Sequence, residues 1–303
     1  MIIYVDENDE LQRLDSFLSG ILSEYSRSKI QKFIKDANIT VNDVVKKPAY
    51  LLKDRDKISI SLPEANDVKL EPQNLPLDVV YEDENMLVIN KPSGMLTHPT
   101  SLELENTLVN ALLYKYGDSL SDVNGEFRRG ILHRLDRNTS GLLMIAKNNG
   151  THEYLAEQIK SHAIIKKYRA ILKGNYPLDE ERIELPIGRN PNQPHKMMVR
   201  EDGKPSTTVL KVLKRYGEVT FVELTLITGR THQIRVHSSY KKHPVYNDTL
   251  YGAGKGKVNT QEQVLQSYYL RFTKPFSDEI IEVEIEPDEK ITKVLNYYES
   301  RQK

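Results

Sequence analysis

Apolar residues in the first part of the chain follow a helical spacing and then a strand spacing. They recur every three or four residues over 11–22 and again after Ser26, a residue type common at helix N-caps. Asn38 suits the left-handed end of this second helix, residues 42–43 suit a hairpin turn, and residues 58–62 alternate as a strand does. The pattern predicts a compact α+β unit with two helices and a small sheet.

The stretch that follows interrupts every periodic pattern. Residues 63–76, PEANDVKLEPQNLP, combine three prolines with polar side chains. This composition is typical of a linker or of a tether lying across a surface. We therefore expect a small N-terminal domain over 1–62, a linker over 63–76 and a larger domain over 77–303.

Strand patterns dominate the larger domain. Helical patterns interrupt them at 106–116, 151–162 and 231–240 and in the C-terminal ITKVLNYYES. Many short strands with few helices between them favour a mixed, largely antiparallel sheet over a doubly wound parallel one, so the predicted fold class is α+β. The strand-like segments are VVYED, MLVINKP, GILHRL, GLLMIA, KYRAILKG, STTVLKVL, VTFVELTLI, YYLRFTKPF and EIIEVEIEP.

The composition of the chain excludes several kinds of functional site. The 303 residues include no cysteine, which excludes disulfides, a thiolate nucleophile and thiolate metal ligands, and which agrees with a reducing cytoplasm. The acidic N-terminus is unlike a signal peptide and no stretch approaches the roughly 20 apolar residues of a membrane span, so we expect a cytoplasmic protein with no membrane partner. With 43 basic and 43 acidic residues the net charge is 0, so binding to a polyanion would depend on local clusters of Lys and Arg.

The segment HRLDRNTSG is the first candidate for chemistry. Asp136 lies between two predicted strands, with Arg134 and Arg137 beside it and Thr139 and Gly141 just after it. Opposite charges nearby favour the ionised form of a carboxyl group, so an anionic Asp136 is expected. The alternative is that Asp, Asn, Thr and Gly simply form a hairpin turn with solvated charges.

A second polar segment, LTLITGRTHQIRVH, follows a predicted strand. Arg230 and Arg235 could pair with Asp136 or with a phosphate, because the planar guanidinium fits either group. The alternative is a helix with a polar, solvated face. His232 and His237 lack the HExxH spacing and a third ligand, so they are more simply structural, and no metal site is expected.

Two further segments carry residues suited to nucleic acid. Tyr168 begins a predicted strand among basic residues and could stack on a base or pass a proton, although most strand tyrosines only pack. In SRSKIQKFIK, Arg27, Lys29, Lys32 and Lys35 are not interrupted by an acid. Such a run fits a phosphate-facing surface, and it equally fits a solvated helix face.

Taken together, four ordered segments resemble the RluA family of pseudouridine synthases. They are NKPSGMLTHP (90–99), GILHRLDRNTSGLL (130–143), KKYRA (166–170) and TGRTHQIRVH (228–237). The N-terminal part resembles an S4 RNA-binding domain through RLD (13–15), SRSKI (26–30), ITVND (39–43) and KKP (46–48). The resemblance extends over nearly the whole chain and implies the pseudouridine synthase fold.

The resemblance also implies roles for individual residues. In this family the Asp of HRLD is the essential carboxylate, here Asp136, and the Arg before Leu helps to displace the target base, here Arg134. The tyrosine that lies against the uracil and is proposed to handle the C5 proton corresponds to Tyr168. The arginine that pairs with the aspartate corresponds to Arg235, and Leu270 is expected at the floor of the pocket. Arg137, Thr139, Arg230, His232, Arg27, Lys29 and Lys32 complete the expected RNA-binding set.

The implied partner is RNA, with ribosomal RNA favoured over transfer RNA by the S4-like domain. No cofactor and no obligate protein partner are expected, and the chain is expected to act as a monomer. Asn38 and Asp43 stand where the S4 turn usually has glycine, and VLQS (264–267) stands where the family often has Leu-His-Ala. Two other functions stay open: a non-catalytic RNA-binding factor, and an Asp-dependent hydrolase of a glycosidic bond, which would normally need a second carboxylate.

Overall fold

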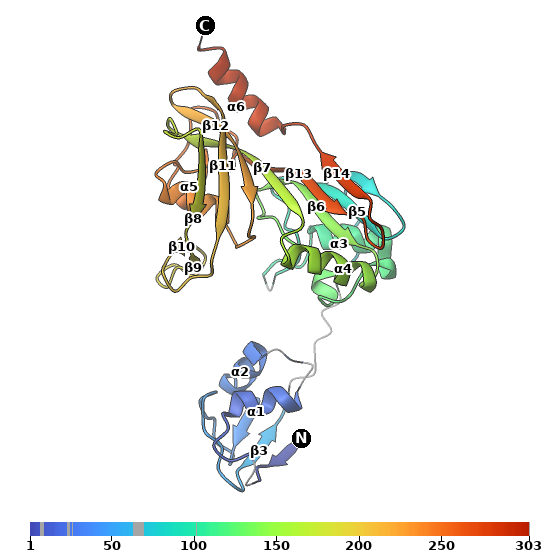
Figure 1. The fold of residues 1–303 in the computed structure, drawn as a ribbon. Coiled ribbons are helices and arrows are strands. Elements are labelled where there is room, and N and C mark those ends of the chain that lie inside the picture. Colours follow the sequence, from blue (N-terminus) through green and yellow to red (C-terminus); the bar gives the residue numbers. More distant parts are fainter. Residues whose placement is uncertain (7–8, 23–24, 26, 63–69, 101, 303) are drawn as a thin grey trace. The chain divides into compact units, whose positions relative to one another are not determined.

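The structure is a computed structural model, and it describes residues 1–6, 9–22, 25, 27–62, 70–100 and 102–302. It divides the chain into two compact units, Met1–Lys69 and Leu70–Lys303 (Figure 1). Each unit has its own hydrophobic core and is described separately below.

The small unit packs two helices against an antiparallel sheet with the strand order β1-β3-β2. The apolar positions at helical spacing form its core, because Leu14, Leu18, Ile30 and Ile34 are all fully buried. The described elements are β1 (Ile2–Tyr4), α1 (Leu14–Ile21), α2 (Arg27–Lys35), β2 (Ile39–Val41) and β3 (Lys57–Ile60).

The ends of these elements differ in detail from the sequence expectation. Leu11 has a φ of 64° and is exposed, so α1 begins later than its apolar pattern does. The left-handed residue after α2 is Ala37 (φ 61°), not Asn38, and the predicted cap Ser26 lies outside the described residues. The hairpin turn is confirmed at Asn42 and Asp43, with φ values of 53° and 61°, conformations that Asn and Asp accept more readily than other non-glycine residues.

The large unit is built on a sheet of nine described strands. Its path is β4-β5-β6-β13-β7-β12-β11-β8, and β14 pairs with β13. Every described pair in this sheet is antiparallel except β13 with β6, so the predicted α+β class with a mixed, largely antiparallel sheet is confirmed. The strands are β4 (Val79–Glu82), β5 (Met86–Lys91), β6 (Ser140–Ala146), β7 (Ile165–Lys173), β8 (Glu180–Glu184), β11 (Thr207–Arg215), β12 (Val219–Leu226), β13 (Leu265–Thr273) and β14 (Ile280–Glu284).

Helices lie beside this sheet at the places that the periodicity predicted. They are α3 (Leu108–Tyr116), α4 (Asn149–Lys160), α5 (Gln233–Tyr240) and α6 (Glu289–Glu299). Figure 1 shows α3 and α4 near β5 and β6, and α5 near β8 and β11. A short hairpin of β9 (Ile187–Arg189) and β10 (Met197–Val199), absent from the expectation, forms a separate two-stranded sheet. In the described part of the chain, no helix has the length and apolar character needed to cross a membrane.

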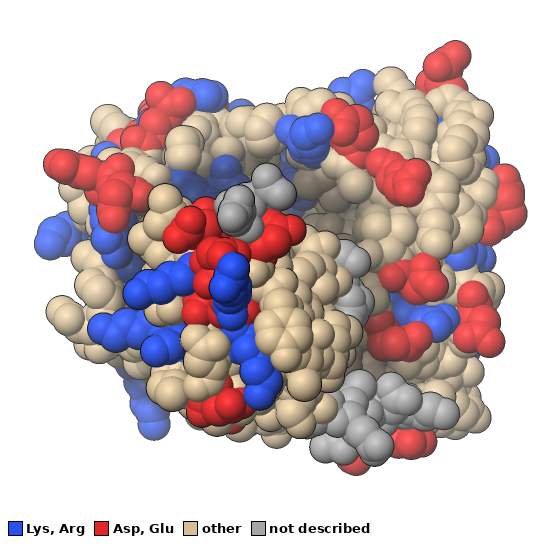
Figure 2. Space-filling model, turned by 90° about the horizontal axis from the view of Figure 1, so that it is seen from below, with Lys and Arg blue, Asp and Glu red and all other residues tan. Residues whose placement is uncertain are grey.

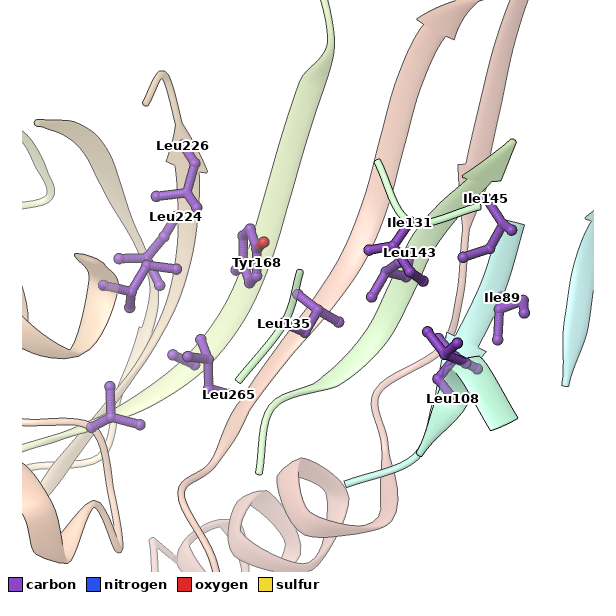
Figure 3. Close-up of a cluster of buried hydrophobic side chains, with 14 of the residues drawn as sticks. Ile89, Leu108, Ile131, Leu135, Leu143, Ile145, Tyr168, Leu224, Leu226 and Leu265 are labelled. Carbon is purple, nitrogen blue, oxygen red and sulfur yellow. The ribbon is translucent and has the colours of Figure 1, made fainter. Parts of the chain in front are cut away.

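A continuous core runs across the sheet and reaches the segment before Asp136. Ile131 and Leu135 on that segment are buried in the same cluster as Tyr168 and Leu143. Figure 3 shows Leu135 between Tyr168 on one side and Leu143 on the other. The core therefore fixes the approach to the candidate carboxylate.

The strand predicted for GILHRL is wrong. Only Ile131 makes an isolated bridge, to Ile145, and the segment otherwise forms a loop. Its backbone meets β6 only at its start, where the N–H of Ala146 donates to the carbonyl of Gly130 at 2.9 Å, and further on the Thr97 hydroxyl donates to the carbonyl of Leu135 at 2.9 Å. The alternating apolar residues that resembled a strand are anchors of this loop in the core.

Gly141 allows the loop to join the sheet. A Cβ atom at this position would lie 2.0 Å from the carbonyl oxygen of Ser267, so no other residue permits the close approach of β6 to β13. Ser267 is in turn paired with Tyr168 on β7. The glycine thus brings the segment that follows Asp136 next to the strand pair that carries Tyr168.

The expected linker over 63–76 falls partly outside the described residues, since 63–69 are not described. Of the remaining part, Leu70 is buried in the core of the large unit. The side chain of Gln73 accepts from the backbone of Asn106, and its backbone N–H donates to the carbonyl of Asn110. This part of the segment is attached to the large unit, while the exact domain boundaries stay a prediction.

Candidate active site

A cavity of about 530 Å³ opens over the sheet of the large unit. It is lined by the loop 132–139, by β7 and by the stretch from the end of β12 into α5. Its size is within the usual range for sites that hold a small molecule or a single nucleotide. The structure brings seven of the predicted residues to this cavity: Arg134, Asp136, Thr139, Tyr168, Arg230, His232 and Arg235.

Asp136 is held by an arginine that is itself held by a second carboxylate. Nη1 of Arg235 donates to Oδ2 of Asp136 at 3.0 Å. Nε and Nη2 of the same guanidinium donate to the two carboxylate oxygens of Asp248 at 2.7 and 2.9 Å. Burial alone would lower the pKa of Arg235, but Asp248 and then Asp136 raise it, so Arg235 is permanently charged.

Asp136 is the first residue of a tight turn, as the residues DRNT suggested. The backbone N–H of Thr139 donates to the carbonyl of Asp136 at 3.1 Å. The expectation of two flanking arginines beside the carboxylate is wrong for the described residues. Arg137 pairs with Glu103 at 2.5 Å, and Arg134 is exposed and makes no ion pair with Asp136. Arg137 is thus engaged outside the site, whereas Arg134 lines the same cavity as Asp136 without pairing with it.

Two lysines hold the backbone after Asp136. Nζ of Lys91, which is fully buried, donates to the carbonyl of Arg137 at 3.0 Å. Nζ of Lys290 donates to the carbonyl of Asn138 at 3.0 Å. The same two carbonyls also accept from the N–H of Gly94 and from the hydroxyl of Ser93, both at 2.9 Å, so the position of the turn is fixed by four bonds.

His232 is a second side chain close to the carboxylate of Asp136. Its Nε2 is 3.8 Å from Oδ2 of Asp136, and its Nδ1 is hydrogen-bonded to the hydroxyl of Tyr251 at 2.7 Å. Burial lowers the pKa of His232 and outweighs the opposite effect of Asp136, so the imidazole is neutral at pH 7. His232 therefore adds no positive charge beside Asp136.

Tyr168 is almost completely buried on β7 and lines the same cavity. Burial raises the pKa of its hydroxyl to about 12, and the charge of Asp136 adds to this rise. The group is therefore protonated throughout the neutral range. A protonated phenol next to a cavity can donate a hydrogen bond or exchange a proton with a bound ligand.

The cavity is basic although the chain as a whole is neutral. The face of the molecule in Figure 2 carries acidic and basic side chains close to one another, without a single field of one sign. At the cavity, by contrast, one carboxylate, Asp136, is accompanied by five cationic side chains: Arg134, Lys160, Lys166, Arg230 and Arg235. Local clustering thus supplies the positive potential that the net charge does not.

Leu270 does not form the floor of this cavity, contrary to the expectation. It is fully buried in another cluster, with Leu142 and with Leu155 of α4. The leucine of β13 that lines the cavity is Leu265. The register of β13 against β7 shifts between Ser267 and Tyr269. The part of β13 after this shift packs against α4.

The basic residues predicted on the small unit lie on α2. Arg27 is engaged with Asp15, to which Nη2 donates at 3.0 Å. Lys29 lies over the ring of Phe33 at 5.1 Å, and Lys32 is exposed. An RNA-binding role for these three residues stays a prediction.

Sequence reasoning missed Asp248, Tyr251 and Lys91. Asp248 and Tyr251 occur together in NDTLYG, and Lys91 ends a strand that begins with four apolar residues. A lysine at the end of a buried strand was the available signal, because such a charge must find partners. Asp248 offered no comparable signal, since its partner lies 13 residues away across a loop. Within the described residues, no group of three or more His, Cys, Asp or Glu side chains is arranged to hold a metal ion.

Comparison with known families identifies both units. A model described as RNA pseudouridylate synthase matches residues 85–240, and a model of the S4 domain matches residues 12–58. The first match includes Asp136, Tyr168 and Arg235, and the second includes Asp15 and Arg27.

Individual relatives agree with these matches. The RNA pseudouridine synthase YlyB of Bacillus subtilis (strain 168) is 39% identical over 295 residues, covering 97% of this chain and 96% of that protein. Ribosomal large subunit pseudouridine synthase D of Zymomonas mobilis is 35% identical over 285 residues, covering 90% of each. Among solved structures, Human RNA Pseudouridylate Synthase Domain Containing 1 superposes with a TM-score of 0.57 at 30% identity, covering 71% of this chain and 84% of that one.

Proposed function

Because the chain belongs to the RNA pseudouridylate synthase family, with an S4 domain before the catalytic unit, we propose that it converts specific uridines of large-subunit ribosomal RNA to pseudouridine with Asp136 as the catalytic carboxylate. The observation that carries this proposal is the placement of Asp136. Its carboxylate lies at a basic cavity, and it is fixed by a buried arginine that a second carboxylate orients. Such a group is charged, oriented and open to a ligand.

The reaction breaks the bond between C1′ and N1 of uridine, turns the base and joins C5 to C1′. The proton leaves C5 and a proton is gained at N1, so substrate and product contain the same atoms and no redox partner is consumed. We propose that the reaction needs no cofactor. An anionic Asp136 can attack the sugar or assist removal of the 2′ proton, and both roles use the same carboxylate.

Tyr168 is proposed to lie against the uracil and to exchange the C5 proton. Its ring is fixed in the core next to Leu135, and its hydroxyl is neutral because its pKa is raised to about 12. A neutral phenol donates or relays a proton without adding a second negative charge beside Asp136.

The target base must leave its stack to enter the cavity. This costs a few kcal/mol, which a side chain inserted in its place can offset. Arg134 is the proposed inserting residue, because it lines the cavity and yet is exposed and free of an ion pair among the described residues. Arg230 and His232 line the remaining wall and are proposed to contact the nucleotide.

Two observations favour ribosomal RNA of the large subunit as the substrate. Relatives that span 90% of this chain carry the name ribosomal large subunit pseudouridine synthase D, and the chain has an S4 domain. All proposed catalytic groups come from one chain, so we propose that the monomer is active, in the cytoplasm where ribosomal RNA is found.

The hydrolase alternative requires a second carboxylate at the cavity. Asp248 is close to Arg235, but both its oxygens accept from that guanidinium and it does not line the cavity. It therefore has no free oxygen to act as acid or base on a ligand there.

Tritium release from RNA labelled at C5 of uridine tests the reaction class. The purified chain should release tritium and form pseudouridine in an unmodified transcript of large-subunit ribosomal RNA. RNA binding without tritium release would leave only the binding-factor function, and free uracil would identify a hydrolase. An equal transcript of transfer RNA in a parallel assay serves as the matched substrate control.

Mapping pseudouridines in cells with and without the protein tests the substrate. We expect specific positions in large-subunit ribosomal RNA to lose the modification when the protein is absent. Loss at transfer RNA positions alone would overturn the substrate proposal while leaving the reaction intact.

A further inference from the structure

A second cavity, of about 460 Å³, adjoins the first. It lies at the base of the β9–β10 hairpin, and it shares Gly229, Arg230 and Thr231 with the lining of the active-site cavity. These three residues therefore form a ridge between two neighbouring cavities. A ligand that extends beyond the first cavity on this side enters the second.

The second cavity is strongly basic. Its lining contains four cationic side chains and one carboxylate, Asp202. Nε and Nη2 of Arg200 both donate to that carboxylate, so the acid is already occupied. The cationic residues are Arg189, Arg200, Lys204 and Arg230.

Several donors in this lining are unused. Among the described residues, Nζ of Lys204 has no hydrogen-bond or ion-pair partner, and it is exposed. Nε of Arg230 donates to the carbonyl of Pro205 at 3.2 Å, which leaves its two terminal nitrogens without partners in the same set of residues. Unpaired cationic donors gathered around a concave surface are suited to a phosphate, which offers several acceptor oxygens.

The position of Arg200 is fixed by the backbone around it. A Cβ atom at Gly188 would lie 2.5 Å from Cδ of Arg200, so only glycine lets this side chain lie across β9. Nη1 of Arg200 also donates to the carbonyl of Arg189 at 3.1 Å. The floor of the second cavity is thus ordered before any ligand enters.

We propose that the second cavity binds the phosphodiester backbone next to the everted uridine, with Arg189, Lys204 and Arg230 as the phosphate contacts. This inference rests on the proposed function, because it takes RNA as the ligand of the first cavity. The ridge residue Arg230 connects the two sites, and a nucleotide places its phosphate on the side of the sugar away from the base. The hairpin is therefore part of the substrate-binding surface and helps to select RNA that can follow this path.

The test is the salt dependence of RNA binding by the double variant R189Q/K204Q of the full chain. Binding to an unmodified transcript of large-subunit ribosomal RNA is measured by filter retention at several salt concentrations. Log affinity falls as log salt rises, and the steepness of this fall should be smaller by about 2 in the variant, since each lost phosphate contact removes about 1. The affinity near 0.1 M salt should fall by about tenfold to hundredfold.

The matched control is the double variant K211Q/K214Q. Both lysines lie on β11 outside the two cavities and pair with Glu180 and Glu299, so the same charge is removed elsewhere. It should retain the slope and affinity of the natural protein. An unchanged slope in R189Q/K204Q, or an equal decrease in both variants, would overturn the proposal.

Two further readouts keep the outcomes distinct. The charge-conserving variant R189K/K204R should recover most of the affinity, and failure to recover it in a protein with a normal melting temperature would contradict a phosphate contact. Tritium release is measured in parallel: if the natural protein binds RNA and releases none, the proposed function fails while the binding slopes still decide the fate of the second site.

Discussion

Two aspartates, one in each unit, are paired with arginine in opposite ways. Asp15 in the small unit has a fully buried side chain, and both oxygens accept hydrogen bonds from Arg13 and Arg27, with a further bond from Gln31 at 2.6 Å. Asp136 is 18% exposed, and among the described residues only Oδ2 of its carboxylate accepts a hydrogen bond, from Arg235. Both oxygens of Asp15 are thus occupied by hydrogen bonds within the protein, whereas Asp136 has one oxygen left for a ligand.

The arginines of the two pairs also differ in their exposure to solvent. The side chains of Arg13 and Arg27 are 47% and 50% exposed, whereas that of Arg235 is 8% exposed and is anchored by Asp248. At Asp15 the carboxylate is buried and its partners are solvated. At Asp136 the arginine is buried and the carboxylate is accessible. The candidate catalytic pair therefore has a buried arginine and an accessible aspartate, whereas the structural pair has a buried aspartate and exposed arginines.

Arg235→Ala should have the largest effect. It leaves Asp136 and the buried Asp248 without a counter-charge, and breaking a buried pair in this way costs about 3–5 kcal/mol. The unfolding free energy of the large unit, measured by urea denaturation, should fall by this amount, and tritium release should be lost. Arg235→Lys retains a charge but not the fork that reaches both carboxylates, so it should restore only part of the stability. An Arg235→Ala protein as stable as the natural one would contradict the account.

Tyr168→Phe should have the second largest effect. The ring remains in the core, while the neutral hydroxyl next to Asp136 is removed. The rate of tritium release at saturating enzyme should fall by about 10² to 10⁴, the usual contribution of a proton-transfer group, and RNA affinity should stay within about twofold. A rate close to that of the natural protein would limit Tyr168 to packing against the base.

Asp15→Ala should destabilise the small unit by less than Arg235→Ala destabilises the large one. The arginines that it leaves behind are half exposed and can be hydrated, so we expect about 1–3 kcal/mol, the range for losing buried hydrogen bonds. Hydrogen exchange measured on peptides of residues 1–62 and 77–303 separates the two units. Faster exchange should be confined to the small unit, and an equal effect on peptides around Asp136 would contradict independent cores.

The smallest expected effect is the loss of stability of the small unit at acidic pH. Hydrogen bonds from Arg13, reinforced by Arg27 and Gln31, hold the pKa of Asp15 well below its usual range despite burial. A carboxyl group whose pKa is lowered on folding stabilises the protein at pH values above its unfolded pKa of about 3.9 and loses this contribution as the pH falls. Protection of the small unit, meaning its exchange rates corrected for the intrinsic rate at each pH, should therefore fall below about pH 4 in the natural protein, and this acid dependence should be weaker in Asp15→Ala. Identical acid profiles would show that other carboxyl groups control the unit.

The sequence was sufficient for the parts of the site that lie within short motifs. Asp136, Tyr168 and Arg235 were chosen from separate segments, and the structure brings them to one cavity. Periodicity also located the helices within a few residues, because an apolar stripe at helical spacing has few other uses.

The parts that the sequence did not predict depend on contacts between distant segments. Asp248 is recognisable only through its bond to Arg235. Leu270 was expected at the cavity from the resemblance alone, and the register shift in β13, which leaves no signal in the residues themselves, could not be predicted. The alternating residues of GILHRL matched a strand, but the Thr97 hydroxyl that holds this loop, and the two lysines that hold the turn after it, come from elsewhere in the chain.

The central claim is that the free carboxylate oxygen of Asp136 acts on the uridine. Asp136→Asn keeps the size of the side chain and an oxygen that can accept from Arg235, and it removes only the charge. With enzyme in excess over an RNA transcript labelled at C5 of uridine, this variant should release no tritium above background while it binds the RNA within about twofold of the natural protein. Tritium release at a rate near that of the natural protein would contradict the account.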